Sequence, residues 1–179
     1  TNSKHPIARV EDFAGLKFRP IQAKISQETI KALGANPVPL AIPELYTALE
    51  TRTIDGQGTP NAVIAALKLN EVQKFLSITR HTYSPFVPLV SKAFWDKLTP
   101  AQQKILKDAA VEARTYQRQV AREQSEAARK AMADRGMKVN EVSDAERARM
   151  RERVQPVWNM FTPDVGQDLV GQVEAQLKK

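Results

Sequence analysis

The sequence predicts an α/β fold, because short apolar segments alternate with helical segments up to about residue 92 and longer helical segments follow. Short strands separated by helices favour a parallel sheet with crossover connections. The composition, with 42% hydrophobic and 26% charged residues, is typical of a globular protein. We therefore expect the later, longer helices to brace and cover a sheet formed by the first part of the chain.

The first predicted strand is followed by a helix and a second extended segment. Residues 16–19 alternate apolar and polar side chains and stop at Pro20, which is typical of a short strand. Residues 22–33 predict a helix that Gly34 closes as its C-terminal cap. The apolar residues 38–42 predict a buried strand or extended segment, and the proline inside it favours an edge or end position.

A second helix, a turn and a third helix are predicted next. Residues 43–50 suit a helix with a proline in its first turn. Residues 54–60 are rich in turn residues and predict a loop or strand end. Residues 61–69 predict another helix, and residues 72–78 and 83–91 predict two strands.

The clearest helix signal begins at Thr99. This residue is a good N-cap, Pro100 takes the first helical position and Gln102 completes a capping box. Apolar residues then recur at helical spacing, and the pattern ends at Gly136. A helix of about 33 residues is ~50 Å long and would span two lobes. Residues 137–139 predict one further short strand.

Two shorter signals complete the chain. Ser143 and Glu146 form a second capping box and predict another helix start. Residues 162–164 predict the start of a last helix that runs close to Lys179.

Several classes of function lack their usual residues. Cysteine is absent, so no disulfide, thiol nucleophile or cysteine-bound metal can form. The two histidines, His5 and His81, are far apart in sequence, which disfavours a histidine metal site or catalytic triad. The sequence also lacks a glycine-rich phosphate loop, a Gly-x-Ser-x-Gly motif and a His-Glu-x-x-His motif. We therefore expect no enzyme, no metal and no cofactor.

The net charge of +7 allows two interpretations. Basic residues are interleaved with acidic ones and never form a run of five, so a solubilising surface is favoured over nucleic-acid binding. No apolar run is long enough to cross a membrane. Residues 1–5 lack the apolar region of a signal peptide, which we expect to have been removed or to belong to a missing segment.

Three local patterns suggest a binding site. Arg19 ends a predicted strand, where a guanidinium can hold a carboxylate through two parallel hydrogen bonds. The turn of residues 54–57 offers Gln57 and, beyond it, Thr59. The aromatic residues 83–86 suit an apolar wall. Each pattern has a structural alternative: a surface arginine or one paired with a nearby acid, a plain turn, and core aromatics.

Six short motifs in register resemble one known family. The family patterns, in chain order, are (E/D)DLKGLKIR, LGAxPxP, EVYxALQ, VDGQ, EVxKYL and WxxLxxexQ. The matching segments are EDFAGLKFR (residues 11–19), LGANPVP (33–39), ELYTALE (44–50), IDGQ (54–57), EVQKFL (71–76) and WDKLTPAQQ (95–103). The chain thus resembles the DctP-like solute-binding proteins of TRAP (tripartite ATP-independent periplasmic) transporters.

The resemblance implies a periplasmic-binding-protein-like fold with two α/β lobes and a long bracing helix. In such proteins an arginine at the position of Arg19 holds the ligand carboxylate, and lobe closure presents the ligand to membrane subunits. The expected ligand-binding residues are Arg19, Gln22, Ile42, Gln57, Thr59, Ser84 and Phe86. The expected partners are a small carboxylate and the TRAP membrane subunits, with a periplasmic location, no nucleic acid and only peripheral contact with membrane proteins.

The resemblance also predicts a domain organisation. Residues 1–85 would form the second, ligand-binding lobe. Residues 86–135 would add a returning strand of the first lobe and the long lobe-spanning helix, and residues 136–179 a C-terminal helical segment. Family members are considerably longer, so we expect the N-terminal part of the first lobe to be missing, apolar surface to be exposed, and residues 1–179 alone to bind ligand weakly.

Two departures from the family pattern bear on the ligand. Thr59 replaces an asparagine that commonly contacts the ligand, and Ile42 stands where an aromatic residue is frequent. Both departures caution against assuming a familiar C4-dicarboxylate or sialic acid. A periplasmic carboxylate sensor or partner-binding module with the same fold is the main alternative function.

Overall fold

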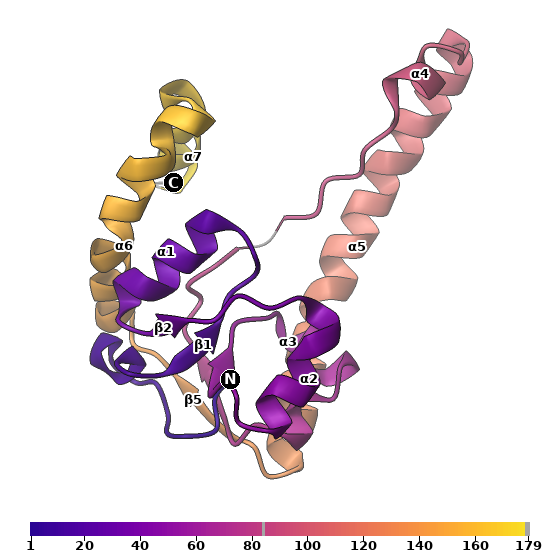
Figure 1. Cartoon of the computed structure of the whole chain (residues 1–179). Helices are drawn as coiled ribbons and strands as arrows, with labels where there is room; N and C mark the ends of the chain where they lie inside the picture. The colour runs from indigo at the N-terminus through magenta and orange to yellow at the C-terminus, as the bar shows by residue number, and fades with distance from the viewer. Residues whose placement is uncertain (84, 178–179) are drawn as a thin grey trace.

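The structure is a computed structural model that describes residues 1–83 and 85–177. Figure 1 shows a body of short strands and helices, from which two long helical segments extend on opposite sides. The N-terminus lies beside the strands of the body, and the C-terminal helix folds back at the end of one of the two extensions. The α/β class expected from the sequence is confirmed by this arrangement.

Within the described residues, five short strands form two sheets. The larger sheet has the order β2-β1-β3, and the smaller sheet pairs β4 with β5. All of these ladders are parallel, as the sequence predicts. Asn2 joins the sheets through antiparallel bridges to Gly56 and Phe75. The strands are β1 (Lys17–Arg19), β2 (Asn36–Pro37), β3 (Gly56–Gln57), β4 (Phe75–Ile78) and β5 (Lys138–Glu141).

Helices connect the strands and form both extensions. The two 3-10 turns are η1 (Val10–Phe13) and η2 (Leu69–Glu71). The helices of the body are α1 (Lys24–Leu33), α2 (Ile42–Glu50) and α3 (Asn61–Ala66). The helices of the extensions are α4 (Lys92–Trp95), α5 (Pro100–Asp134), α6 (Asp144–Val165) and α7 (Gln167–Leu177).

The helix boundaries follow from local side-chain chemistry. The backbone N–H of Gln102 donates to Thr99 Oγ1 at 3.3 Å, and that of Glu146 donates to Ser143 Oγ at 3.2 Å, so both predicted N-caps are confirmed. Gly34 ends α1 with φ 104, a left-handed conformation that glycine adopts at little cost. The 35 residues of α5 correspond to about 52 Å, as expected for the long helix.

Two apolar clusters stabilise the body. In the first, Phe18 of β1 packs edge-on against Phe13 with ring centroids 5.8 Å apart, and α1 and α6 contribute further side chains. In the second, Leu45 of α2 and Ile64 of α3 lie with Met132 from the C-terminal end of α5. Among the described residues, the long helix is therefore anchored to the body through its C-terminal part.

The strand predicted over residues 83–91 is wrong for the described part of that segment. Tyr83 and residues 85–91 have no strand assignment, and Phe86 and Leu89 are both 89% exposed. Strand formation depends on a neighbouring strand and a surface to pack against. Among the described residues this segment has neither, so its strand-like composition is not enough.

Two other predicted boundaries are also wrong. Residues 38–41 leave the sheet after β2 without forming a strand, so the strand alternative for this segment is wrong, and Ile42 begins a helix instead of ending the segment. The last helix does not start at residues 162–164, because α6 continues through Pro163 to Val165 and breaks at Gly166, which has φ 96. Thr162 Oγ1 donates to the Trp158 carbonyl at 2.7 Å within that continuous helix.

Smaller differences concern the ends of other elements. The helix predicted over residues 61–69 stops at Ala66 and is followed by η2. The strand predicted over residues 72–78 is limited to β4, and that predicted over residues 137–139 becomes β5.

Candidate functional site

The order of the larger sheet places a topological switch point at β1. The chain passes from β1 through α1 to β2 on one side, and then through α2 to β3 on the other side. Right-handed crossovers in opposite directions put the two helices on opposite faces, and α1 and α2 indeed belong to different apolar clusters. Ligands of such sheets bind outside the carboxyl ends of the strands at the switch point.

Arg19 is the last residue of β1 and so lies at this point. Its neighbour Phe18 points into the first apolar cluster, and strand alternation directs Arg19 to the other face. The residue is only 3% exposed. Its Nε and Nη2 both donate to the carbonyl oxygen of Leu40, at 2.9 and 2.7 Å. The predicted strand-end arginine is therefore buried and oriented by the backbone.

The charge of Arg19 has no acidic partner among the described residues. Ion pairs are formed by other arginines, and Glu11, an acid close to Arg19 in sequence, pairs with Arg149 and Arg153 instead. Asp12 accepts the backbone N–H groups of residues 8 and 9, each at 2.8 Å. Burial lowers the pKa of Arg19 from its ordinary value because desolvation disfavours the charged form. An anion placed beside this guanidinium would compensate the lost hydration.

Gln57 lies at the same edge of the sheet as Arg19. The two residues are register partners in the β1–β3 ladder, so their side chains share one face. Gln57 is fully buried, its Nε2 donates to Thr1 Oγ1 at 2.9 Å, and its Oε1 accepts the hydroxyl of Thr59. The predicted pair Gln57 and Thr59 is thus joined by a hydrogen bond, with Thr59 partly buried.

The other predicted ligand-binding residues lie less close to Arg19. Ile42 begins α2 two residues after the carbonyl that holds Arg19, and it is 41% exposed. Gln22 is exposed in the bend that follows β1. Phe86 is exposed in the irregular segment after β4, and no described contact brings it to Arg19. Ser84 lies outside the described residues.

His81 is a titratable side chain that the site prediction did not include. Its ring lies edge-on to Phe18 with centroids 6.5 Å apart, and its Nδ1 is 2.6 Å from Thr79 Oγ1. A Cβ at Gly58 would come within 2.8 Å of Nε2, so glycine is needed beside the ring. Burial lowers the pKa of His81 to about 4, which keeps the ring neutral. The spacing of Thr79 and His81, which resembles a Thr-x-His pattern of the family, is its one sequence signal.

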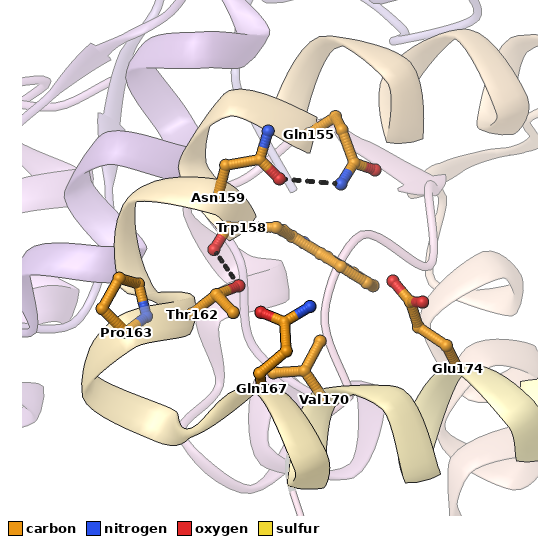
Figure 2. A pocket seen from close by; sticks show the side chains of 8 residues that line it. All are labelled: Gln155, Trp158, Asn159, Thr162, Pro163, Gln167, Val170 and Glu174. Carbon is orange, nitrogen blue, oxygen red and sulfur yellow. Dashed lines mark hydrogen bonds between the residues drawn. The ribbon is translucent and has the colours of Figure 1, made fainter.

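Two surface hollows elsewhere are poor carboxylate sites. One of about 270 Å³ lies between α6 and α7, where Trp158, Gln167, Val170 and Glu174 surround it (Figure 2). None of its lining residues is basic, and Glu174 would repel an anion. The second lies beside Arg149 and Arg153, which already pair with Glu11. Arg19 therefore stays the strongest anion-binding candidate.

Other kinds of site find no support in residues 1–83 and 85–177. No cluster of three histidine, aspartate or glutamate side chains is placed to hold a metal ion. In the same part of the chain, no helix combines the length and apolar character needed to cross a bilayer.

A buried arginine at the switch point of a parallel sheet has the position and the charge that a small-anion site would need. The chain belongs to the DctP family, bacterial extracellular solute-binding protein family 7, which it matches over residues 1–164. It is 39% identical, over 177 residues and 97% of its length, to the 2,3-diketo-L-gulonate-binding periplasmic protein YiaO of Escherichia coli. The chain covers 53% of that relative and so spans about half of its length.

Two solved structures of binding proteins share the fold. A TRAP periplasmic solute-binding protein from Ochrobactrum anthropi, with its C-terminus bound in the ligand-binding pocket, gives a TM-score of 0.93 at 47% identity. That match covers 99% of this chain and 56% of the other. The sugar acid-binding protein DctPAm from Advenella mimigardefordensis, in complex with galactonate, gives 0.87 at 38% identity and covers 97% and 56% of the two chains. These relatives are binding proteins, in agreement with the expectation that the chain is not an enzyme.

Proposed function

We propose that this chain forms the ligand-binding lobe of a periplasmic TRAP solute-binding protein that carries a small organic carboxylate to membrane subunits. The family membership supports the class of protein, and the galactonate bound by one similar structure supports an acid as ligand. Arg19 would hold the carboxylate of this ligand. Two lobes would close around the ligand, and the contacts that the ligand makes only in the closed state would stabilise that state. The closed protein would then deliver the ligand to the membrane subunits.

The observation that carries the proposal is the unpaired, buried guanidinium of Arg19. A buried charge without a counter-ion is costly, and such groups are found where they bind a ligand or a partner. Within the described residues the Leu40 carbonyl is the acceptor of its hydrogen bonds, and a carbonyl dipole compensates only part of the lost hydration. A ligand carboxylate would supply the missing negative charge.

The rim of the proposed site would consist of Gln22, Ile42, Gln57, Thr59, Ser84 and Phe86. Gln57 and Thr59 lie at the sheet edge next to Arg19, which supports their inclusion. The proposal for Phe86 requires the segment after β4 to approach the site. We propose that residues 86–91 pair with a strand of a second lobe, which would give this apolar segment the neighbour that it lacks among the described residues.

The test is ligand binding by the protein at its full natural length, measured by calorimetry with galactonate and 2,3-diketo-L-gulonate. Arg19→Ala should weaken binding by about 3 kcal/mol, or roughly 100-fold, because the ligand charge is left unpaired in a closed site. Arg19→Lys should recover only part of this loss, since an ammonium cannot make two parallel hydrogen bonds.

Arg118→Ala is the matched control, because Arg118 is exposed on α5 and its loss removes the same charge. Unchanged affinity in Arg19→Ala would remove the clamp from the proposal. A protein that binds neither acid nor any other small carboxylate would favour the sensor or partner-binding module instead.

A further inference from the structure

The guanidinium of Arg19 has two edges that can accept a carboxylate, and the structure distinguishes between them. An arginine carries five N–H groups in a planar fork. One edge is formed by Nε–H with an Nη2–H, and the other by the outer protons of Nη1 and Nη2. The Leu40 carbonyl oxygen accepts from both Nε and Nη2 and therefore occupies the first edge. Within the described residues, no hydrogen bond is made by Nη1 of Arg19.

We infer that the backbone carbonyl of Leu40 is a positioning group, which fixes Arg19 so that a ligand carboxylate binds end-on to Nη1 and Nη2. This inference rests on the proposed function of Arg19 as the carboxylate clamp. It adds the direction from which the ligand arrives and the group that sets that direction. The end-on edge matches the two oxygens of a single carboxylate through parallel hydrogen bonds.

The Leu40 carbonyl is itself held firmly. On the preceding side, Val38 N–H donates to the Phe18 carbonyl of β1 at 3.0 Å. On the following side, the Ala41 N–H donates to the Glu44 carboxylate at 3.3 Å at the start of α2. The side chain of Leu40 packs against the second apolar cluster. Pro39 adds a fixed φ directly before the acceptor.

Because the Leu40 carbonyl is held in this way, it is unfavourable for a ligand to take its place at the Nε–Nη2 edge of Arg19. A carboxylate that approached Nε would have to displace the Leu40 oxygen and leave a partly buried carbonyl without its donors. The free edge requires no such displacement. The acceptor is also a backbone atom, so no side-chain substitution at Leu40 would remove it.

The inference can be tested by nuclear magnetic resonance of the protein at its full natural length, labelled with ¹⁵N-arginine. The Arg19 signals are assigned by their loss in Arg19→Lys. In the ligand-free protein, the Nε–H of Arg19 should exchange with water at least roughly tenfold more slowly than that of exposed Arg118. On addition of galactonate, the Nη signals should shift and separate, while the Nε signal should change little and stay protected.

A loosened acceptor provides a second readout. Pro39→Gly frees the backbone before Leu40, so Arg19 Nε–H exchange should accelerate and galactonate affinity should fall roughly two- to fivefold. Pro6→Gly makes the same change at an exposed proline of the irregular N-terminal segment, and it should alter neither quantity.

The outcomes separate this inference from the proposed function. Fast Nε–H exchange in the ligand-free protein, or a ligand shift that is largest at Nε, would overturn the role of Leu40 while leaving Arg19 as the clamp. Galactonate binding without any change in the Arg19 signals would overturn the clamp itself. Failure of both sugar acids to bind in calorimetry would count against the proposed function and against ligand binding at Nη1 and Nη2. Protection of Nε–H from exchange would still show whether the Leu40 carbonyl holds Arg19.

Discussion

The body and the arm of the molecule have similarly apolar sequences but differ in burial. We define the body as residues 1–82 and the arm as the described residues 83 and 85–120. In the body, Phe13, Leu45 and Ile64 are at most 1% exposed. In the arm, Phe86 is 89% and Tyr116 is 70% exposed. The difference teaches that an apolar sequence pattern indicates that a packing partner is needed but does not identify that partner. Within the described residues, α4 contacts the start of α5, whereas Phe86 and Tyr116 stay exposed.

The largest expected contrast is in stability. Leu45→Ala in the body should lower the free energy of unfolding by about 3 kcal/mol or more, because it leaves a cavity in a close-packed cluster. Ile105→Ala in the arm removes the same kind of side chain where 67% of the residue is already exposed. It should change stability by less than about 0.5 kcal/mol. Urea unfolding followed by circular dichroism measures both, and equal effects would contradict the distinction between body and arm.

The arm also bears on ligand binding. If its apolar residues pack on a second lobe that forms one wall of the site, residues 1–179 alone leave Arg19 open to water on that side. A charge pair is much weaker in contact with water than in a closed site. Galactonate affinity of residues 1–179 should therefore be at least roughly 100-fold below that of the protein at its full natural length. Equal affinities in calorimetry would show that the body is a sufficient site.

Sequence reasoning succeeded where local chemistry decides the outcome. The position of Arg19 at a strand end followed from alternation and Pro20, and the N-caps Thr99 and Ser143 followed from their spacing to Gln102 and Glu146. The complete capping box forms only at Thr99 among these two, because the Glu146 carboxylate accepts the Val10 N–H instead. The parallel sheet followed from the alternation of strands and helices. The ligand role of Arg19 stays a prediction, because neither position nor burial demonstrates binding.

Sequence reasoning failed where a distant segment decides the outcome. Residues 83–91 have strand composition, but strand formation depends on a neighbouring strand that local composition does not report. The Leu40 carbonyl could not be foreseen, because any residue supplies a carbonyl and only the approach of residues 38–41 to β1 selects this one. His81 was passed over for a similar reason, since its slot beside Phe18 and Gly58 is formed by three separate segments.

His81 gives the body a pH dependence that the arm should not share. In the unfolded chain its ring titrates near pH 6.5, whereas burial lowers the pKa in the folded chain to about 4. The unfolded state thus binds the proton more tightly, so stability is fully present above about pH 6.5 and falls as the pH is lowered toward 4. The expected loss between pH 7 and pH 5 is about 2 kcal/mol.

Urea unfolding at these two pH values measures the loss. His81→Gln cannot titrate and retains an amide that can bond to Thr79, so it should reduce the loss by about 2 kcal/mol. The dependence that remains would come from other groups such as the Thr1 amine, whose pKa burial lowers to about 5. An unchanged pH dependence in that variant would assign the effect to other groups and would contradict the burial of a neutral His81.

The smallest expected effect concerns strained backbone in the body. Lys68 is exposed and has φ 54, a left-handed conformation that is unfavourable for residues with a Cβ. Lys68→Gly should therefore raise the free energy of unfolding by about 0.5–1 kcal/mol, the relief of strain exceeding the entropy that glycine loses on folding. Lys74→Gly is the matched control, because Lys74 is also exposed but is not among the residues with positive φ. It should instead lower stability by a similar amount. The stabilisation by Lys68→Gly should appear as slower hydrogen exchange in the body, with exchange in the arm unchanged. Destabilisation by both changes would instead mean that Lys68 makes a contact that compensates its strain.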